Sequence, residues 1–104
     1  MDQEGQESVF SATTEFDGDH ATVLIRGEVD MSTAETMFQA ATRATATRVT
    51  LDLREVSFFD SAAIQALIRL TDHYPAGLVV IPSRQVRRVL DISGLGEQPW
   101  LRPR

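Results

Sequence analysis

The sequence predicts a single α/β domain with a mixed, mostly parallel sheet of four or five strands, an N-terminal hairpin and three or four helices. Short apolar runs typical of buried strands alternate with segments whose apolar residues recur at helical spacing. A turn signal separates the first two runs, whereas helical segments separate the later ones, which indicates parallel strands joined by crossovers. The 104 residues include no cysteine, so the core is expected to form without disulfides or zinc-thiolate sites.

The chain is expected to consist of a flexible tail at residues 1–9 and a folded domain at residues 10–104. Residues 10–16 and 21–26 are predicted to form a hairpin around the turn Asp17-Gly18-Asp19. Residues 27–31 are interpreted as a loop. Ser32 is the predicted N-cap of the next helix because Glu35 follows at capping-box spacing. The helix is expected to turn one apolar face inward, made of Ala34, Met37, Phe38 and Ala41.

The second half of the chain begins with the central strand, predicted at residues 49–53. A helical pattern starts at Ser61 and ends before Pro75, and residues 78–81 form the next predicted strand. Ser83 and Gly94 mark the start and stop of a last helix. Trp100 and Leu101 are predicted to add an edge strand. The residues expected to face inward are Ile64, Leu67, Ile68 and Thr71 in the first of these helices and Val86, Val89 and Leu90 in the second.

Charge is distributed unevenly along the chain, whose formal net charge is −5. Residues 1–60 hold twelve carboxylates against four arginines, whereas residues 61–104 hold three against six. The acidic first half argues against direct nucleic-acid binding, and the cluster Arg84, Arg87 and Arg88 is interpreted as a solvated helix face. No apolar run is long enough to insert into a membrane, and the polar residues 1–8 do not resemble a secretory signal. A cytoplasmic protein is expected.

The junction Asp60-Ser61 is the most informative feature of the sequence. It lies where a strand ends and a helix begins, so unpaired backbone N–H groups and the positive end of the helix dipole surround the Ser61 hydroxyl. A serine there can be a helix cap, a nucleophile or a phosphorylation site. Glu28 and Asp30 follow another predicted strand and are expected at the same edge of the sheet. Asp60 can itself cap the helix, which would leave the Ser61 hydroxyl free.

Catalysis at this junction is disfavoured because no general base is available. His73 stands twelve residues along the same predicted helix, about 18 Å away at 1.5 Å per residue. Phosphate-binding loops are absent, and the chain has no lysine. A metal site at Glu28, Asp30 and Asp60 is disfavoured because no histidine accompanies them. We therefore expect no enzyme activity, no cofactor and no metal, and a small nucleotide-binding enzyme remains the least favoured alternative.

Three segments together resemble the STAS domain, and within it the bacterial anti-sigma factor antagonists. The first is Gly27-Glu28-Val29-Asp30 with Thr33-Ala34, and the third is Val89-Leu90-Asp91-Ile92-Ser93-Gly94-Leu95. The second, and the most specific, is Leu51-Asp52-Leu53 with Val56, Phe58 and Phe59-Asp60-Ser61. The resemblance extends from Phe10 to Trp100.

The resemblance implies a partner-switching role. In such proteins the unmodified antagonist binds an anti-sigma factor with serine kinase activity and frees the sigma factor, and phosphorylation of the serine after the strand-ending aspartate blocks binding. That serine is Ser61 here, and a serine phosphatase is the implied counterpart of the kinase. The implied partner-binding residues are Glu28, Asp30, Asp60, Ser61, Ala62 and Gln65.

The residues after Ser61 depart from the family pattern and define an alternative. Family members usually continue with Ser or Thr and then Gly-Leu-Gly, whereas this chain continues with Ala62-Ala63-Ile64-Gln65. The alternative is a STAS adaptor that works without phosphorylation, in a stressosome-like or lipid-transport complex.

Overall fold

The structure, a computed structural model, describes residues 10–43 and 45–103, so the tail expected at residues 1–9 lies outside the described part. One sheet has the strand order β1-β2-β3-β4, with β1 antiparallel to β2 and the other neighbours parallel. The predicted α/β class, N-terminal hairpin and mixed sheet are confirmed. The elements are β1 (Ser11–Asp17), β2 (His20–Val29), α1 (Ala34–Arg43), β3 (Arg48–Phe59), α2 (Ser61–His73), β4 (Leu78–Pro82) and α3 (Arg84–Ile92).

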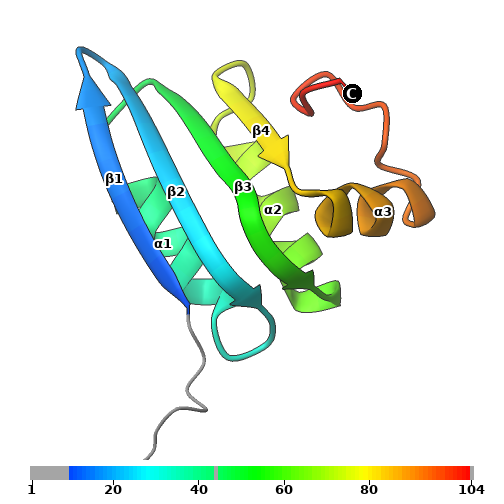
Figure 1. Ribbon diagram of the computed structural model, residues 1–104. Helices are drawn as coiled ribbons and strands as arrows, with labels where there is room; N and C mark the ends of the chain where they lie inside the picture. The colour runs from blue at the N-terminus through cyan, green and yellow to red at the C-terminus, as the bar shows by residue number, and fades with distance from the viewer. Residues whose placement is uncertain (1–9, 44, 104) are drawn as a thin grey trace, which may run out of the picture.

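The helices form a second layer on one side of the sheet. Figure 1 shows α1 and α2 side by side behind the strands, and the two helices also pack against each other. Helix α3 has a different place. It begins where the short strand β4 ends and packs beside the part of β3 that runs on past β4. In the described part of the chain, no helix covers the front of the sheet in this view.

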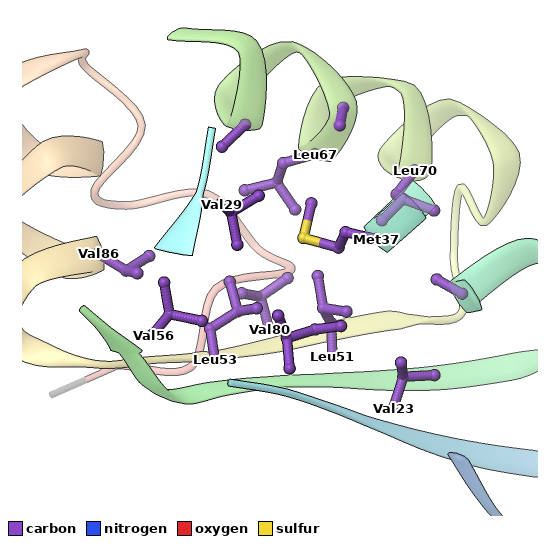
Figure 2. Close-up of a cluster of buried hydrophobic side chains, with 14 of the residues drawn as sticks. Val23, Val29, Met37, Leu51, Leu53, Val56, Leu67, Leu70, Val80 and Val86 are labelled. Atoms are coloured by element: carbon purple, nitrogen blue, oxygen red, sulfur yellow. The ribbon is translucent and has the colours of Figure 1, made fainter. Parts of the chain in front are cut away.

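The hydrophobic core lies between the sheet and the helix layer. Figure 2 shows Met37 and Leu67, from the two helices, directed toward Leu51 and Leu53 on β3. All four side chains are fully buried. Val86 of α3 points toward Val56 and extends this core around the end of β4. Burial of a side chain of this size stabilises the fold by about 1.5–3 kcal/mol, so the core supplies the main driving force for folding.

Strand β2 is longer than the sequence predicted. A loop was expected at residues 27–31, and this prediction is wrong for residues 27–29, which belong to β2. Gly27, with a φ of 97°, sits at a register shift against β3, and pairing resumes at Glu28. Ile25, Gly27 and Val29 are buried while Arg26 and Glu28 are exposed. This period-of-two alternation continues through the glycine, which marks a bulge rather than the end of the strand. Likewise, β3 runs six residues past its predicted end at Leu53 to Phe59.

Helix α2 turns a different face inward from the one predicted. Its buried residues are Ala63, Ala66, Leu67 and Leu70, whereas Ile68 is 38% exposed and Ile64 is partly buried. The prediction followed the largest apolar side chains. The observed inward face instead combines two alanines with Leu67 and Leu70 at helical spacing.

The C-terminal elements follow the sequence prediction. The Ser83 hydroxyl caps α3 by accepting from the Val86 N–H at 3.1 Å and donates to the Val56 carbonyl at 2.7 Å. Gly94 adopts a φ of 81° just after the helix. The predicted edge strand is a single bridge between Val80 and Leu101.

Asp52 is the one buried charged residue among the described positions. Its carboxylate accepts from the Arg54 backbone N–H at 3.1 Å and from the Arg54 guanidinium at 2.8 Å and 3.0 Å. Hydrogen bonds from Arg54 hold the pKa of Asp52 below its usual range, against the opposing effect of burial. A lowered pKa means that Asp52 stabilises the fold above the ordinary carboxyl pKa and ceases to do so as the pH falls through the folded-state value.

We therefore expect Asp52→Asn to lower the free energy of unfolding by about 1 kcal/mol at neutral pH and by much less under acid conditions, because a protonated carboxyl has already lost the interaction. Urea unfolding at neutral and acid pH measures this convergence. Asp17→Asn, at an exposed strand end, is the control and is expected to change little. A deficit that stays constant with pH would contradict the prediction.

Candidate functional site

The ends of β2 and β3 bring together the polar residues that the sequence singled out. Glu28 pairs with Phe58 and Val29 with Phe59 in the parallel ladder. The Asp60 N–H then donates to the Val29 carbonyl at 3.3 Å. Asp30 and Asp60 therefore follow neighbouring strands at the same edge of the sheet, as expected for the carboxyl ends of parallel strands.

Asp60 is the N-cap of α2. Its side chain accepts from the Ala63 N–H at 3.0 Å, and its backbone carbonyl accepts from the Ile64 N–H at 3.0 Å. Ser61 is the first residue of the helix, is exposed, and makes no side-chain hydrogen bond with a described residue. The aspartate performs the capping, so the serine hydroxyl is directed to solvent at the positive end of the helix.

Asp30 organises the turn between β2 and α1. Its carboxylate accepts from the Ser32 N–H at 2.9 Å and from the Ser32 hydroxyl at 2.7 Å. These bonds, led by the hydroxyl, hold the pKa of Asp30 below its usual range. The prediction that Ser32 caps α1 is wrong: the helix begins at Ala34, and Ser32 bonds Asp30 instead. Thr33 closes the turn by donating to the Glu28 carbonyl at 2.8 Å.

One stripe of α2 extends the site along the helix surface. Gln65 and Ile68 follow Ser61 at spacings of four and seven residues, so they share its face, and both are exposed. Ala62 is half-buried, and Ala63 is fully buried beneath the stripe. Gln65 is thus beside Ser61, whereas Ala62 lies at the flank of this surface.

Apolar side chains near the site are the part that the sequence analysis missed. Phe58 is 49% exposed at the end of β3, and Met31 is 84% exposed in the turn after Asp30. Ile68, assigned to the core in the prediction, is on the exposed stripe. The strand alternation held a signal for Phe58, because Phe59 is buried and its neighbour therefore points the other way. These exposed apolar side chains are candidates for contact with a protein partner.

The chemistry of this surface is that of a hydroxyl acceptor beside carboxylates. His73 ends α2, and its ring contacts Tyr74 and Phe38, with centroids 4.8 Å and 6.2 Å away. It therefore lies at the opposite end of the helix from Ser61. In residues 10–43 and 45–103, no group of three histidine or carboxylate side chains is arranged to hold a metal ion. The geometry suits modification of Ser61 by an external enzyme and docking of a protein partner.

Fold and site together define a small α/β domain that presents a serine at a strand-to-helix junction. A family model described as "Mlab, STAS domain" matches residues 12–103. The chain belongs to the STAS domain family. No curated protein matches it. Within the described residues, no helix is long and apolar enough to cross a membrane.

Solved structures of anti-sigma factor antagonists share the fold. The unphosphorylated form of SpoIIAA is 23% identical, with a TM-score of 0.70, covering 90% of this chain and 88% of that one. An anti-sigma factor antagonist from Mycobacterium paratuberculosis is 24% identical, with a TM-score of 0.79, covering 91% and 86%. The phosphorylated form of the Bacillus cell fate determinant SpoIIAA is 21% identical, with a TM-score of 0.63, covering 90% and 91%.

Proposed function

We propose that this protein is an anti-sigma factor antagonist switched by phosphorylation at Ser61. Its unphosphorylated form binds an anti-sigma factor with serine kinase activity and releases the sigma factor. Phosphorylation of Ser61 by that kinase blocks binding, and a serine phosphatase restores it. The protein acts in the cytoplasm, as a binding module without a cofactor or catalytic activity of its own.

The observation that carries the proposal is that Asp60, and not Ser61, caps the helix. Because Asp60 caps α2, the Ser61 hydroxyl is exposed and unbonded within the described chain. A phosphate there adds about −1.5 to −2 charges at pH 7. The positive helix end makes that charge tolerable within the domain, whereas Asp60 and Asp30 make the outer surface densely negative. The penalty of phosphorylation therefore falls on the complex rather than on the fold.

The proposed docking surface combines the polar cluster with the exposed stripe of α2. Apolar contact at Ile68 would supply affinity, and the polar residues would set orientation. Burying an added phosphate against a partner that fits the neutral hydroxyl costs several kcal/mol by desolvation and like-charge repulsion. The residues proposed to contact the partner are Glu28, Asp30, Asp60, Ser61, Ala62 and Gln65.

The experiment is incubation with the cognate anti-sigma kinase and ATP, followed by mass spectrometry of the modified peptide and gel filtration of the mixture. We expect phosphate on Ser61 and loss of the complex as it accumulates, with recovery after phosphatase treatment. Ser61→Ala is expected to keep the complex and to take up no phosphate. An unmodified Ser61 under conditions where the complex forms would remove the switch, and no complex at all would remove the proposed role.

A second candidate is a STAS adaptor that works without phosphorylation in a stressosome-like or lipid-transport complex. Two observations favour it: the matching family model bears the name Mlab, and alanines follow Ser61. Ala63 is fully buried, so this position serves helix packing rather than access by a kinase. The adaptor predicts that a pulldown recovers the same partners with wild type and Ser61→Asp, whereas the antagonist predicts that Ser61→Asp loses its partner.

A further inference from the structure

Four arginines gather around α3 and the segment that follows it. Arg84, Arg87 and Arg88 belong to α3, and Arg102 lies in the C-terminal segment. All four line a cavity of about 570 Å³. Among the described residues that line this cavity, Asp91 is the one carboxylate. A protein with a net charge of −5 thus concentrates positive charge in one hollow of its surface.

The placement of two of these arginines is unfavourable for the isolated domain. Arg84 and Arg88 are four residues apart on α3, so their like charges lie on the same face and repel. Arg84 is the first residue of the helix, where the dipole favours negative groups, and the first turn contains no acidic residue. Neither makes an ion pair with a residue in the described part of the chain. An anionic ligand would relieve both effects.

The same two arginines also border a partly apolar hollow. A second cavity, of about 390 Å³, is lined by Arg84 and Arg88 together with Phe58 and Val89. Because the two cavities share these arginines, they adjoin. We name the pair the α3 groove. One end offers an exposed aromatic ring and a valine, and the other offers four guanidinium groups.

The wall of the groove is held in place before any ligand binds. The Arg87 guanidinium donates to the Arg102 carbonyl and, at 3.5 Å, to the Gly96 carbonyl. The Arg102 N–H donates to the Val80 carbonyl at 2.9 Å, which fixes the C-terminal segment to β4. A preformed wall reduces the ordering cost of binding.

We infer that the α3 groove binds an acidic segment of a protein partner, with an apolar side chain beside Phe58 and carboxylates beside Arg84 and Arg88. Arginine is suited to carboxylates because its planar fork can donate two hydrogen bonds at once. A nucleic acid fits less well, because the twelve carboxylates of residues 1–60 repel an extended polyanion. A small anion would leave the apolar end unfilled. The inference does not depend on the phosphorylation of Ser61.

The test is NMR titration of the full ¹⁵N-labelled chain with an acetylated peptide that carries one leucine between runs of glutamate. An extended peptide rises about 3.3 Å per residue, so about ten residues can cross both cavities. We expect shifts confined to α3, Phe58 and the segment around Arg102, with binding that weakens as salt rises. Shifts elsewhere, or none, would overturn the inference. If inorganic phosphate or a short DNA duplex shifted the same resonances equally, the groove would bind anions in general, and the inference of an acidic protein segment would be overturned.

Charge reversal at the groove provides the matched comparison. Arg84→Glu and Arg88→Glu are each expected to weaken peptide binding at least about tenfold at low salt. Arg43→Glu changes the net charge equally from the exposed end of α1 and is expected to have little effect. A similar loss in all three variants would show that net charge alone acts. Ser61→Asp is expected to leave peptide binding unchanged, so a failure here is distinguishable from a failure of the proposed switch.

Discussion

Ser61→Asp is expected to weaken binding of the anti-sigma factor by about a hundredfold or more, while the domain stays folded. The added carboxylate joins Asp60 and Asp30 on a surface that the partner must cover, and a like-charge, desolvated contact costs several kcal/mol. About 2.7 kcal/mol corresponds to a hundredfold change in Kd. Calorimetric titration of the partner with wild type and variant measures the difference.

The fold is not expected to suffer from this substitution. An acidic residue in the first turn interacts favourably with the helix dipole, so the Tm of Ser61→Asp should equal or slightly exceed that of wild type. Ser61→Ala should bind within a few-fold of wild type. Thr45→Asp, exposed on the connection between α1 and β3 at the opposite edge of the sheet, is the control for added charge. If Thr45→Asp weakened binding as much as Ser61→Asp, the effect would not be local to the junction.

Leu67→Ala is expected to lower the free energy of unfolding by about 2–5 kcal/mol. The Leu67 side chain is fully buried, with 0% solvent exposure. It points toward the sheet between Met37 and Val29 (Figure 2). Its truncation removes apolar contact and leaves a cavity that neighbouring helices fill only in part. Chemical denaturation followed by circular dichroism measures the loss.

The adjacent position on α2 supplies the control. Ile68→Ala removes a side chain of similar size that is 38% exposed, and we expect it to cost less than about 1.5 kcal/mol. The same variant should weaken partner binding, because Ile68 lies on the proposed docking surface. Equal destabilisation by the two variants would contradict the helix orientation described above, and the sequence-based orientation with Ile68 inside would regain support.

Local signals in the sequence were sufficient for most of the architecture. The turn Asp17-Gly18-Asp19 and the Ser83 cap depend on residues that are neighbours in the chain, and both are present in the structure. The Asp60-Ser61 junction was found for the same reason, since a change from strand to helix period is visible without knowledge of the tertiary contacts. Glu28 and Asp30 were placed at the same edge by a rule on parallel strands, and the ladder confirms it.

The sequence did not predict features that depend on tertiary contacts. Gly27 resembled a loop residue, but pairing with Val56 across a bulge keeps it within β2. Ser32 resembled a cap, but the Asp30 carboxylate competes for its hydroxyl. The inward face of α2 was assigned from side-chain size, whereas the structure buries the small alanines at positions 63 and 66 beside Leu67 and Leu70.

The sequence by itself thus determined the order of the elements, the mixed sheet and the position of Ser61 at the start of a helix, because each follows from periodicity, turns and caps over a few residues. Only the tertiary structure decided which apolar side chains stay exposed. Ile68 faces outward on α2, and β3 continues beyond β4 and leaves Phe58 half-exposed beside α3. A surface made from separate segments depends on how helices and strands are oriented, and that orientation is set by long-range burial of apolar area.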